Sequence, residues 1–376
     1  MSILSNLHAC MCVLCLIKAC GKIRLFASDN LISFTAPQSV FHPPSFPPSL
    51  SFLFIQLCCY ADMESNSSLN PLYFQLTLFA DYGPLRYLFF SLCLLVYMTI
   101  ISANIVIAVT VCLHKSLHQP MFIFICSLSF NSLYGSAGFF PRFLMDILSD
   151  THFISRPLCF IQMYVISTYA AFEFTILGVM AYDRFVAICQ PLHYHSKMTL
   201  RMVQHLLVFA VFYPALACGF CLYLTVRLPL CGNKLHKLFC SNWPVVQLSC
   251  MDTTVNNIAG QLVAMSTIFI PLFFILYTYL RILLVCRRSS SEIRGKAAQT
   301  CLPHIVTLIN YTLSIFCEMS LRRFEADKMN PVFTVVLSLE YLTIPPINNP
   351  LVYGLSLPQI KGVIFRFFKK SPAAKM

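Results

Sequence analysis

The sequence predicts an all-α membrane protein: a bundle of seven transmembrane helices followed by a short amphipathic helix on the cytoplasmic side. Two observations predict this fold class. The chain is 58% hydrophobic and only 11% charged, whereas soluble domains carry about 25% charged residues and about 45–50% apolar ones. Its apolar residues also gather in blocks, and a helix needs roughly 20 of them to cross a bilayer. Spanning strands would instead alternate in polarity over about 10 residues.

The same composition narrows the function classes. A formal net charge of +12 would suit a nucleic-acid-binding protein. The chain has too few polar residues to cover a soluble fold, however, so we expect a lipid bilayer as its partner and no nucleic acid. The sequence contains no metal-ligand cluster, nucleophile elbow or phosphate-binding loop. We therefore expect neither an enzyme nor a bound cofactor or metal.

Each predicted membrane helix corresponds to one apolar block. Backbone polar groups in lipid must be satisfied inside the segment, which favours helices for blocks of this length. The seven blocks occupy residues 87–112, 121–140, 159–189, 203–226, 258–286, 300–319 and 332–357. The membrane domain is thus predicted to extend over 87–357.

Basic and apolar residues interleave after the last block. Apolar Ile360, Val363, Ile364, Phe367 and Phe368 recur at helical spacing, with Lys361, Arg366, Lys369 and Lys370 between them. This pattern predicts an amphipathic helix on the cytoplasmic leaflet, within a tail that covers 358–376.

The distribution of Lys and Arg predicts the orientation in the membrane. The loops after the first, third and fifth blocks and the tail are rich in both, and their only acids are Asp183 and Glu292. On the opposite side basic residues are nearly balanced by acids. We therefore expect a multi-pass plasma-membrane protein whose C-terminus is cytoplasmic and whose residues 63–86 lie outside. Asn66 begins a sequon on that outer side and is a candidate glycosylation site.

Residues 1–62 differ from the rest of the chain. They contain a Pro-rich run over 37–48 and two apolar stretches that are too short to span a bilayer. A signal peptide over the first 20 residues is an alternative, although it lacks an early positive charge and Lys18 interrupts its end. We favour a physiological start at Met63, with 1–62 as an extension that has no fold of its own.

Four cysteines lie on the predicted outer side: Cys159, Cys231, Cys240 and Cys250. The outside of a cell is oxidising, so disulfides are expected there. Four cysteines allow three pairings, and the spacing alone does not choose among them.

The end of the third block carries a specific motif. The run Met180-Ala181-Tyr182-Asp183-Arg184-Phe185-Val186-Ala187-Ile188-Cys189 resembles the signature of odorant receptors, a branch of the rhodopsin-like G-protein-coupled receptors. Further similarities follow the family's order: Asn104, Pro120-Met121-Phe122, Lys296-Ala297-Ala298-Gln299-Thr300-Cys301 with His304, and Pro346-Ile347-Asn348-Asn349-Pro350-Leu351-Val352-Tyr353. Asn131-Ser132-Leu133-Tyr134-Gly135 and Pro303-His304-Ile305 resemble variants of the fish-type branch. The resemblance extends from Met63 to the C-terminus.

This resemblance implies a receptor that binds small odorant molecules on its outer side and activates a stimulatory heterotrimeric G protein. It also implies the disulfides Cys159–Cys240 and Cys231–Cys250. A non-olfactory rhodopsin-like chemoreceptor for a small ligand is an alternative. A transporter is a weaker one, because transporters commonly contain inverted repeats and the halves of this chain show none.

Asp183 and Arg184 are the candidate switch for G-protein coupling. An Arg at the membrane edge is costly unless it is paired or hydrated, so we expect Asp183, or polar groups of the sixth helix, to hold Arg184 at rest. Separation of the helices would free it to contact a partner. In the seventh block Asn349, Pro350 and Tyr353 form a candidate hinge, because Pro350 removes a backbone donor.

Glu173 is a candidate functional acid inside the membrane. It lies about three turns from Arg184 on nearly the same helix face. The resemblance suggests a cation or proton site shared with an acid of the second helix, but that position looks like Ser132 here. The alternative is a protonated, hydrogen-bonded Glu173, since burial disfavours the charged form.

The candidate ligand residues lie on the third and sixth helices: Ile166, Ser167, Ala170, Ala171, Tyr311 and Thr312. Helix packing would use the same positions. A largely apolar pocket with a few hydroxyl groups suits a small, weakly polar molecule.

Overall fold

The computed structural model describes residues 70–79, 83–288, 290–323, 331–357 and 359–363. The candidate glycosylation site Asn66 and the segment 1–62 therefore lie outside the described residues. The chain divides into the units Met1–Asn66 and Ser67–Met376, and every described residue belongs to the second.

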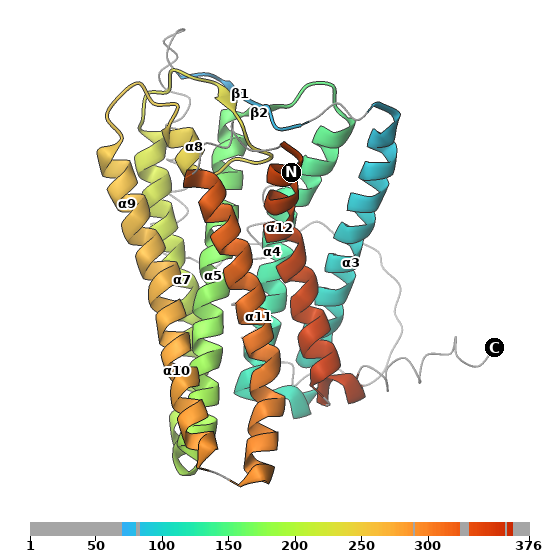
Figure 1. Cartoon of the computed structure of the whole chain (residues 1–376), viewed down its shortest axis with the longest axis vertical. Coiled ribbons are helices and arrows are strands. Elements are labelled where there is room, and N and C mark those ends of the chain that lie inside the picture. The colour runs from blue at the N-terminus through green and yellow to red at the C-terminus, as the bar shows by residue number, and fades with distance from the viewer. Residues whose placement is uncertain (1–69, 80–82, 289, 324–330, 358, 364–376) are drawn as a thin grey trace, which may run out of the picture. The chain divides into compact units, whose positions relative to one another are not determined.

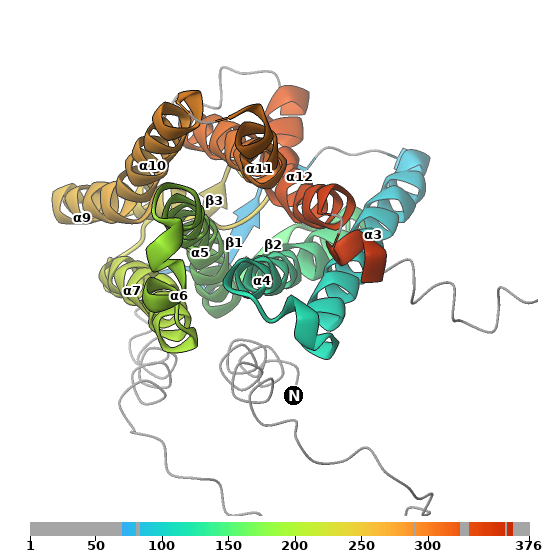
Figure 2. The same ribbon diagram turned by 90° about the horizontal axis from the view of Figure 1, so that it is seen from below.

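Seven long helical segments make up most of the described part and lie side by side (Figures 1 and 2). Each covers one predicted block, so the seven-transmembrane helix bundle predicted from the sequence is confirmed. Their bounds are α3 (Arg86–Leu113), α4 (Pro120–Leu148), α5 (Arg156–Cys189), α7 (Leu200–Val226), α9 (Thr254–Ala264) joined to α10 (Ile270–Arg287) through the π-helical turn η4 (Met265–Phe269), α11 (Ser291–Arg323) and α12 (Pro331–Ser356).

Short helical elements precede the first long helix or connect the long helices. They are η1 (Gly83–Leu85), η2 (Lys115–Leu117), η3 (Pro191–His193), α6 (Tyr194–Lys197) and α8 (Asn242–Val246). Of the predicted amphipathic helix, residues 359–363 are described: they are helical, and Ile360 is buried.

Burial distinguishes the central helix from the outer ones. Of the most apolar window of α5, 83% is buried, against 22% for α3, for α7 and for the continuous helix that runs from Thr254 to Arg287. Seen along the bundle, α5 lies among α4, α7 and α10 (Figure 2). The outer helices expose apolar side chains such as Leu95 and Phe209, as expected for surfaces in contact with lipid.

Polar side chains replace backbone hydrogen bonds that prolines remove. Pro350 has no N–H for the carbonyl of Pro346, one helical turn earlier, and Asn104 Nδ2 of α3 donates to that carbonyl at 2.9 Å. Within the described residues, six helices meet the length and hydropathy needed to cross a membrane. In α12, which has three internal prolines, the Asn104 contact satisfies the carbonyl that Pro350 leaves without a backbone donor.

A three-stranded sheet closes one end of the bundle. The strand β1 (Tyr73–Leu76) lies between β2 (Phe153–Ser155), which is antiparallel to it, and β3 (Lys234–Leu235), which is parallel. Phe74 and Leu76 alternate with exposed Tyr73 and pack into a buried cluster. We call this end of the bundle the sheet end, and the opposite end the Arg184 end. The hydropathy pattern did not predict the sheet, because such short strands leave little periodic signal.

Candidate functional site

At the Arg184 end, Asp183 is the centre of a small polar cluster. Asp183 is fully buried, and its Oδ2 accepts from Arg184 Nε at 2.9 Å and also from Arg184 Nη2. Its second oxygen, Oδ1, accepts from the hydroxyl of Tyr194 at 2.8 Å. Within the described residues, all side-chain hydrogen bonds of Arg184 go to Asp183. The alternative holder expected on the sixth helix is therefore not the one used here.

Tyr194 was not singled out by the sequence. It lies on the short helix α6, and the chain folds back there so that its hydroxyl reaches an acid eleven positions earlier. Burial, and then the charge of Asp183, raise the pKa of Tyr194 well above its ordinary value. Tyr194 is therefore protonated at neutral pH and donates to Asp183.

A second contact at this end joins the fifth and sixth helices. The hydroxyl of Tyr279 on α10 is hydrogen-bonded to Nδ1 of His304 on α11, and both side chains are buried. The sequence placed His304 only within a motif. Its partner on another helix could be found only in the folded structure.

Midway along the bundle, Glu173 joins three helices. It is fully buried on α5, and its two oxygens accept from Asn131 Nδ2 of α4 and from Asn349 Nδ2 of α12, each at 2.7 Å. Ser132, the residue expected beside it, lies 3.5 Å from Asn349 Nδ2. The direct partner on α4 is thus Asn131, the preceding residue. Both carboxyl oxygens have an amide donor, and a cation or proton at Glu173 stays a prediction.

The structure places the three candidate hinge residues on the buried side of α12. Asn349 is 2% exposed and Tyr353 is fully buried. Pro350 lies one turn after the carbonyl that Asn104 occupies. The predicted hinge is therefore joined to α3 through Asn104 and to α5 through Glu173.

At the sheet end, two disulfides fasten the long connection between α7 and α9. Cys159 at the start of α5 is bonded to Cys240, with 5.4 Å between their Cα atoms, and Cys231 is bonded to Cys250, with 5.5 Å. This is the pairing that the resemblance implies. Gln162, one turn after Cys159, accepts from the backbone N–H of Cys240 at 3.0 Å and donates to the carbonyl of Gly138 at 3.3 Å.

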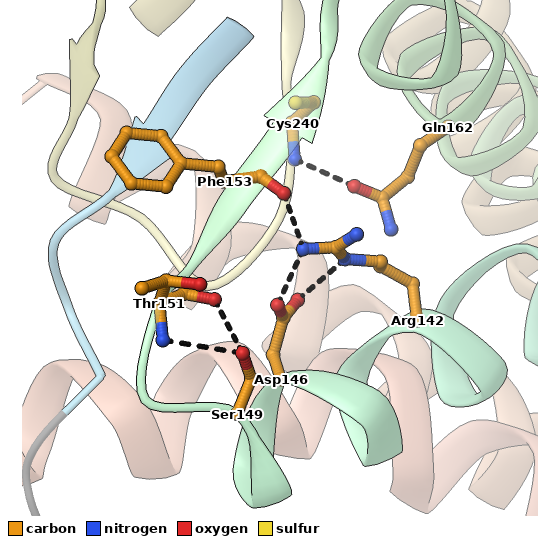
Figure 3. Close-up of polar contacts among 7 residues, drawn as sticks. All are labelled: Arg142, Asp146, Ser149, Thr151, Phe153, Gln162 and Cys240. Atoms are coloured by element: carbon orange, nitrogen blue, oxygen red, sulfur yellow. Dashed lines mark hydrogen bonds and ion pairs between the residues drawn. The ribbon is translucent and has the colours of Figure 1, made fainter.

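An ion pair on α4 secures the sheet at the same end (Figure 3). Arg142 donates twice to Asp146, through Nε at 2.8 Å and Nη2 at 2.6 Å, and Nη2 also donates to the carbonyl of Phe153 in β2 at 2.7 Å. The Asp146 side chain is 1% exposed. The bidentate pair within α4 fixes the position of Arg142, and the charge-assisted bond from Arg142 to the backbone then holds β2 on the end of α4.

The candidate ligand residues lie in the sheet-end half of the bundle. Ile166, Ala170, Ala171 and Tyr311 are buried, whereas Ser167 and Thr312 are half-buried. The Tyr311 hydroxyl donates to the carbonyl of Ala170 at 3.2 Å. This contact brings two of the six candidates together. The hydroxyl of Tyr341 on α12 donates to the carbonyl of a third candidate, Ile166, at 3.4 Å.

Two tyrosines that the sequence did not single out complete this region. The ring of Tyr169 lies with its centroid 6.3 Å from that of Tyr311 and 6.0 Å from that of Tyr341. The three rings come from α5, α11 and α12. Isolated tyrosines in apolar blocks give no sequence signal that they will meet.

Comparison with known proteins adds independent observations. The family model described as "Olfactory receptor" matches residues 92–371. Human olfactory receptor 51I2 is 33% identical over 275 residues, which are 72% of this chain and 88% of that receptor. Human olfactory receptor 52P1 is 36% identical over 273 residues, or 72% and 84% of the two chains.

Mouse olfactory receptor 1M1 is 33% identical over 287 residues, which are 75% of this chain and 90% of that receptor. Among solved structures, squid rhodopsin superposes with a TM-score of 0.62 at 16% identity, covering 80% of this chain and 91% of that one. That similarity concerns the fold. The fish-type branch stays a prediction.

Proposed function

Because the chain belongs to the olfactory receptor family and is a membrane-embedded odorant receptor with a rhodopsin-like fold, we propose that a small odorant binds in the sheet-end half of the bundle and activates a stimulatory heterotrimeric G protein at the Arg184 end. The observation that carries this proposal is the Asp183–Arg184–Tyr194 cluster, which lies at the end opposite the candidate ligand residues. The chain is a signalling receptor rather than an enzyme.

The proposed ligand region contains Ile166, Ser167, Ala170, Ala171, Tyr311 and Thr312. Two of the bonds that join helices there are single hydroxyl-to-carbonyl contacts, from Tyr311 and from Tyr341 to α5. An odorant that packs among these side chains would favour one arrangement of α11 and α12 over another. Binding would then shift a pre-existing equilibrium between receptor states.

Glu173 is the proposed link to the other end. It lies three residues after Ala170 on α5 and holds α4 and α12 through two amide donors. A displacement of α12 at the ligand would change the Asn349 contact first. Pro350 and Tyr353 follow on the same helix, so the displacement would continue toward the Arg184 end.

At that end, G-protein contact requires Arg184 to leave Asp183. Separation of α10 from α11 would also break the Tyr279–His304 bond. Both changes break contacts between side chains, and both expose polar groups to a partner. Asp183 would keep the Tyr194 hydroxyl as its donor.

The deciding experiment is nucleotide exchange on a purified stimulatory G protein, with agonists first identified by screening odorants with a cyclic-AMP readout. We expect Arg184→Ala to lower agonist-stimulated exchange to the basal rate while odorant binding is retained. The control Arg201→Ala removes an exposed arginine of the same end and should leave exchange within about twofold of the parent. Full exchange by Arg184→Ala at equal surface expression contradicts the switch.

The proposed orientation places the sheet end outside a plasma membrane and the C-terminus in the cytoplasm. Asn66 would then carry a glycan. Asn66→Gln should remove a glycosidase-sensitive mobility shift, and a C-terminal epitope should be stained only after permeabilisation. Staining of that epitope on intact cells would show the opposite orientation.

A further inference from the structure

Among the arginines whose side chains the structure describes, four lie at the sheet end, and their partners differ. Arg86 is paired with Asp150 at 2.7 Å, and Arg142 is paired with Asp146. Arg156 and Arg227 form no ion pair with any residue in the described part of the chain. Among the described residues, these two charges therefore have no acid that neutralises them.

Arg156 is the first residue of α5 and is half-buried. Its guanidinium lies 5.4 Å from the ring centroid of Phe160, and its Nη2 reaches the carbonyl of Val226 only at 3.4 Å. Its Nε is buried without a hydrogen-bond partner in the described structure. A guanidinium has five N–H donors, and the contact to Val226 is the only hydrogen bond that this group makes within the described structure.

Arg227 directly follows Val226, the residue that Arg156 contacts, at the end of α7. Its guanidinium lies 5.3 Å from the ring centroid of Tyr223 and donates to the Tyr223 hydroxyl at 2.9 Å. Two guanidinium groups thus flank the same junction between α5 and α7. Each lies near an aromatic ring, and the planar fork of guanidinium N–H donors suits recognition of an oxyanion.

This junction lies where the apolar surface of a membrane helix ends. On α7, Leu216, Phe220 and Tyr223 are 60%, 55% and 41% exposed, and α7 ends at Val226. Aromatic residues beside long cationic side chains are typical of the membrane–water boundary, where phospholipid headgroups lie. Arginine binds phosphate through paired N–H donors.

We propose that Arg156 and Arg227 form a binding site for a phosphate-type oxyanion, supplied by the headgroup of a membrane phospholipid at the outer end of the α5–α7 junction. A bound phosphate would neutralise the two arginines and join the start of α5 to the end of α7. This site is separate from the proposed odorant region and from the Arg184 end, so it does not depend on G-protein coupling.

The test is thermal unfolding of the full-length receptor, purified and delipidated in an uncharged detergent. Three probes are compared: short-chain phosphatidylglycerol, the matching diacylglycerol without phosphate, and inorganic phosphate. We expect phosphatidylglycerol to raise the unfolding midpoint saturably, by about 2–5 °C, and diacylglycerol to have no effect. An equal rise with inorganic phosphate would assign the oxyanion site to a soluble ion instead of a lipid.

Variants locate the effect. The double variant Arg156→Gln/Arg227→Gln should lose the phosphatidylglycerol response, whereas Arg86→Gln, which removes an outer arginine that has its own acid, should retain it. If the double glutamine variant does not fold, Arg156→Lys/Arg227→Lys keeps the charge without the paired donors and should need at least about fivefold more lipid for half the shift. An unchanged response in these variants, or no response in the parent, overturns the proposal.

Discussion

The two ends of the receptor are held by different kinds of bond. The sheet end is fixed by two disulfides, by backbone bonds of a three-stranded sheet and by the bidentate Arg142–Asp146 pair. At the Arg184 end, the described contacts between separate helices include the single side-chain bonds from Tyr194 to Asp183 and from Tyr279 to His304. A disulfide cannot be exchanged for water, and the sheet adds several hydrogen bonds that must break together, whereas one side-chain hydrogen bond contributes about 1 kcal/mol net. This contrast supports the proposal that the receptor stays closed at the sheet end and opens at the Arg184 end.

We expect the largest effect on this difference between the two ends when the Cys159–Cys240 disulfide of the sheet end is removed. Cys159→Ser removes a link that spans 81 positions of sequence, and loss of a native disulfide costs about 2–5 kcal/mol. We expect surface expression to be lost. The measurement is antibody staining of intact cells against total receptor.

The matched control is Cys231→Ser, whose link spans only 19 positions. A shorter loop constrains the unfolded chain less, so its loss should be smaller. Equal surface expression of Cys159→Ser and the parent receptor would show that this disulfide is not needed to stabilise the sheet end.

A second break targets the buried ion pair. Asp146→Ala would leave Arg142 partly buried without its acid, which we expect to cost about 2–4 kcal/mol of unfolding free energy because breaking a buried pair strands a charge. The receptor's thermal midpoint in detergent measures this. Asp150→Ala is the control, because Asp150 is exposed in its pair with Arg86 and exposed pairs contribute little. A midpoint lowered equally by both variants would contradict the role of burial.

Between the two ends, the contacts of Glu173 can be tested separately. Asn131→Ala removes one of its two amide donors and should cost about 1–3 kcal/mol, since a buried acceptor loses its partner. Ser132→Ala removes only a contact at the 3.5 Å limit and should have a smaller effect. We expect Asn131→Ala to change agonist efficacy as well as the thermal midpoint. The reverse order of the two variants would restore Ser132 as the main partner.

We expect the smallest effect on stability from a substitution at the Arg184 end. Tyr194→Phe deletes only the hydroxyl that donates to Asp183, so we expect a loss of about 1 kcal/mol and a basal nucleotide exchange raised severalfold, with surface expression unchanged. Basal exchange without agonist measures the effect. A basal rate equal to that of the parent would show that the contact does not restrain the switch.

The raised pKa of Tyr194 gives this contact a pH window. The folded state holds the phenolic proton more tightly than the unfolded chain does, whose pKa is about 10. The contribution to stability is therefore fully present below about pH 10 and is lost above it as the unfolded state ionises. Between pH 6 and 9 we expect no change in basal exchange from this group, and a rise within that range that Tyr194→Phe abolishes would contradict the assignment.

The positions of the membrane helices were predictable because hydropathy acts locally. Each predicted block lies largely within one helix, and even Cys159 and Cys189 fall within three residues of the start and at the end of α5. The ends were less predictable. The sixth helix begins at Ser291 rather than near Thr300, since polar turns continue a helix into water without any hydropathy signal.

The candidate site was predictable only where a motif marked it. Asp183, Arg184 and Glu173 are unusual residues for an apolar block, so the sequence identified them directly. Their partners Tyr194 and Asn131 are ordinary residues of a loop and of a helix. Asn131 rather than Ser132 meets Glu173 because the rotation of α4 against α5 decides which of two neighbours faces inward.

What the sequence determined by itself was the membrane class, the seven spans and the acids inside them, because each depends on the solvent that a residue meets. Only the tertiary structure decided the partners: the sheet that joins Phe74 to Ile154 and Leu76 to Leu235, and the Arg142 bond to β2. It also decided that Asn104 donates to the carbonyl of Pro346, for which Pro350 has no N–H. Hydrogen bonds and ion pairs act only within a few ångströms, so they depend on how helices are rotated and packed, which no local pattern in the chain encodes.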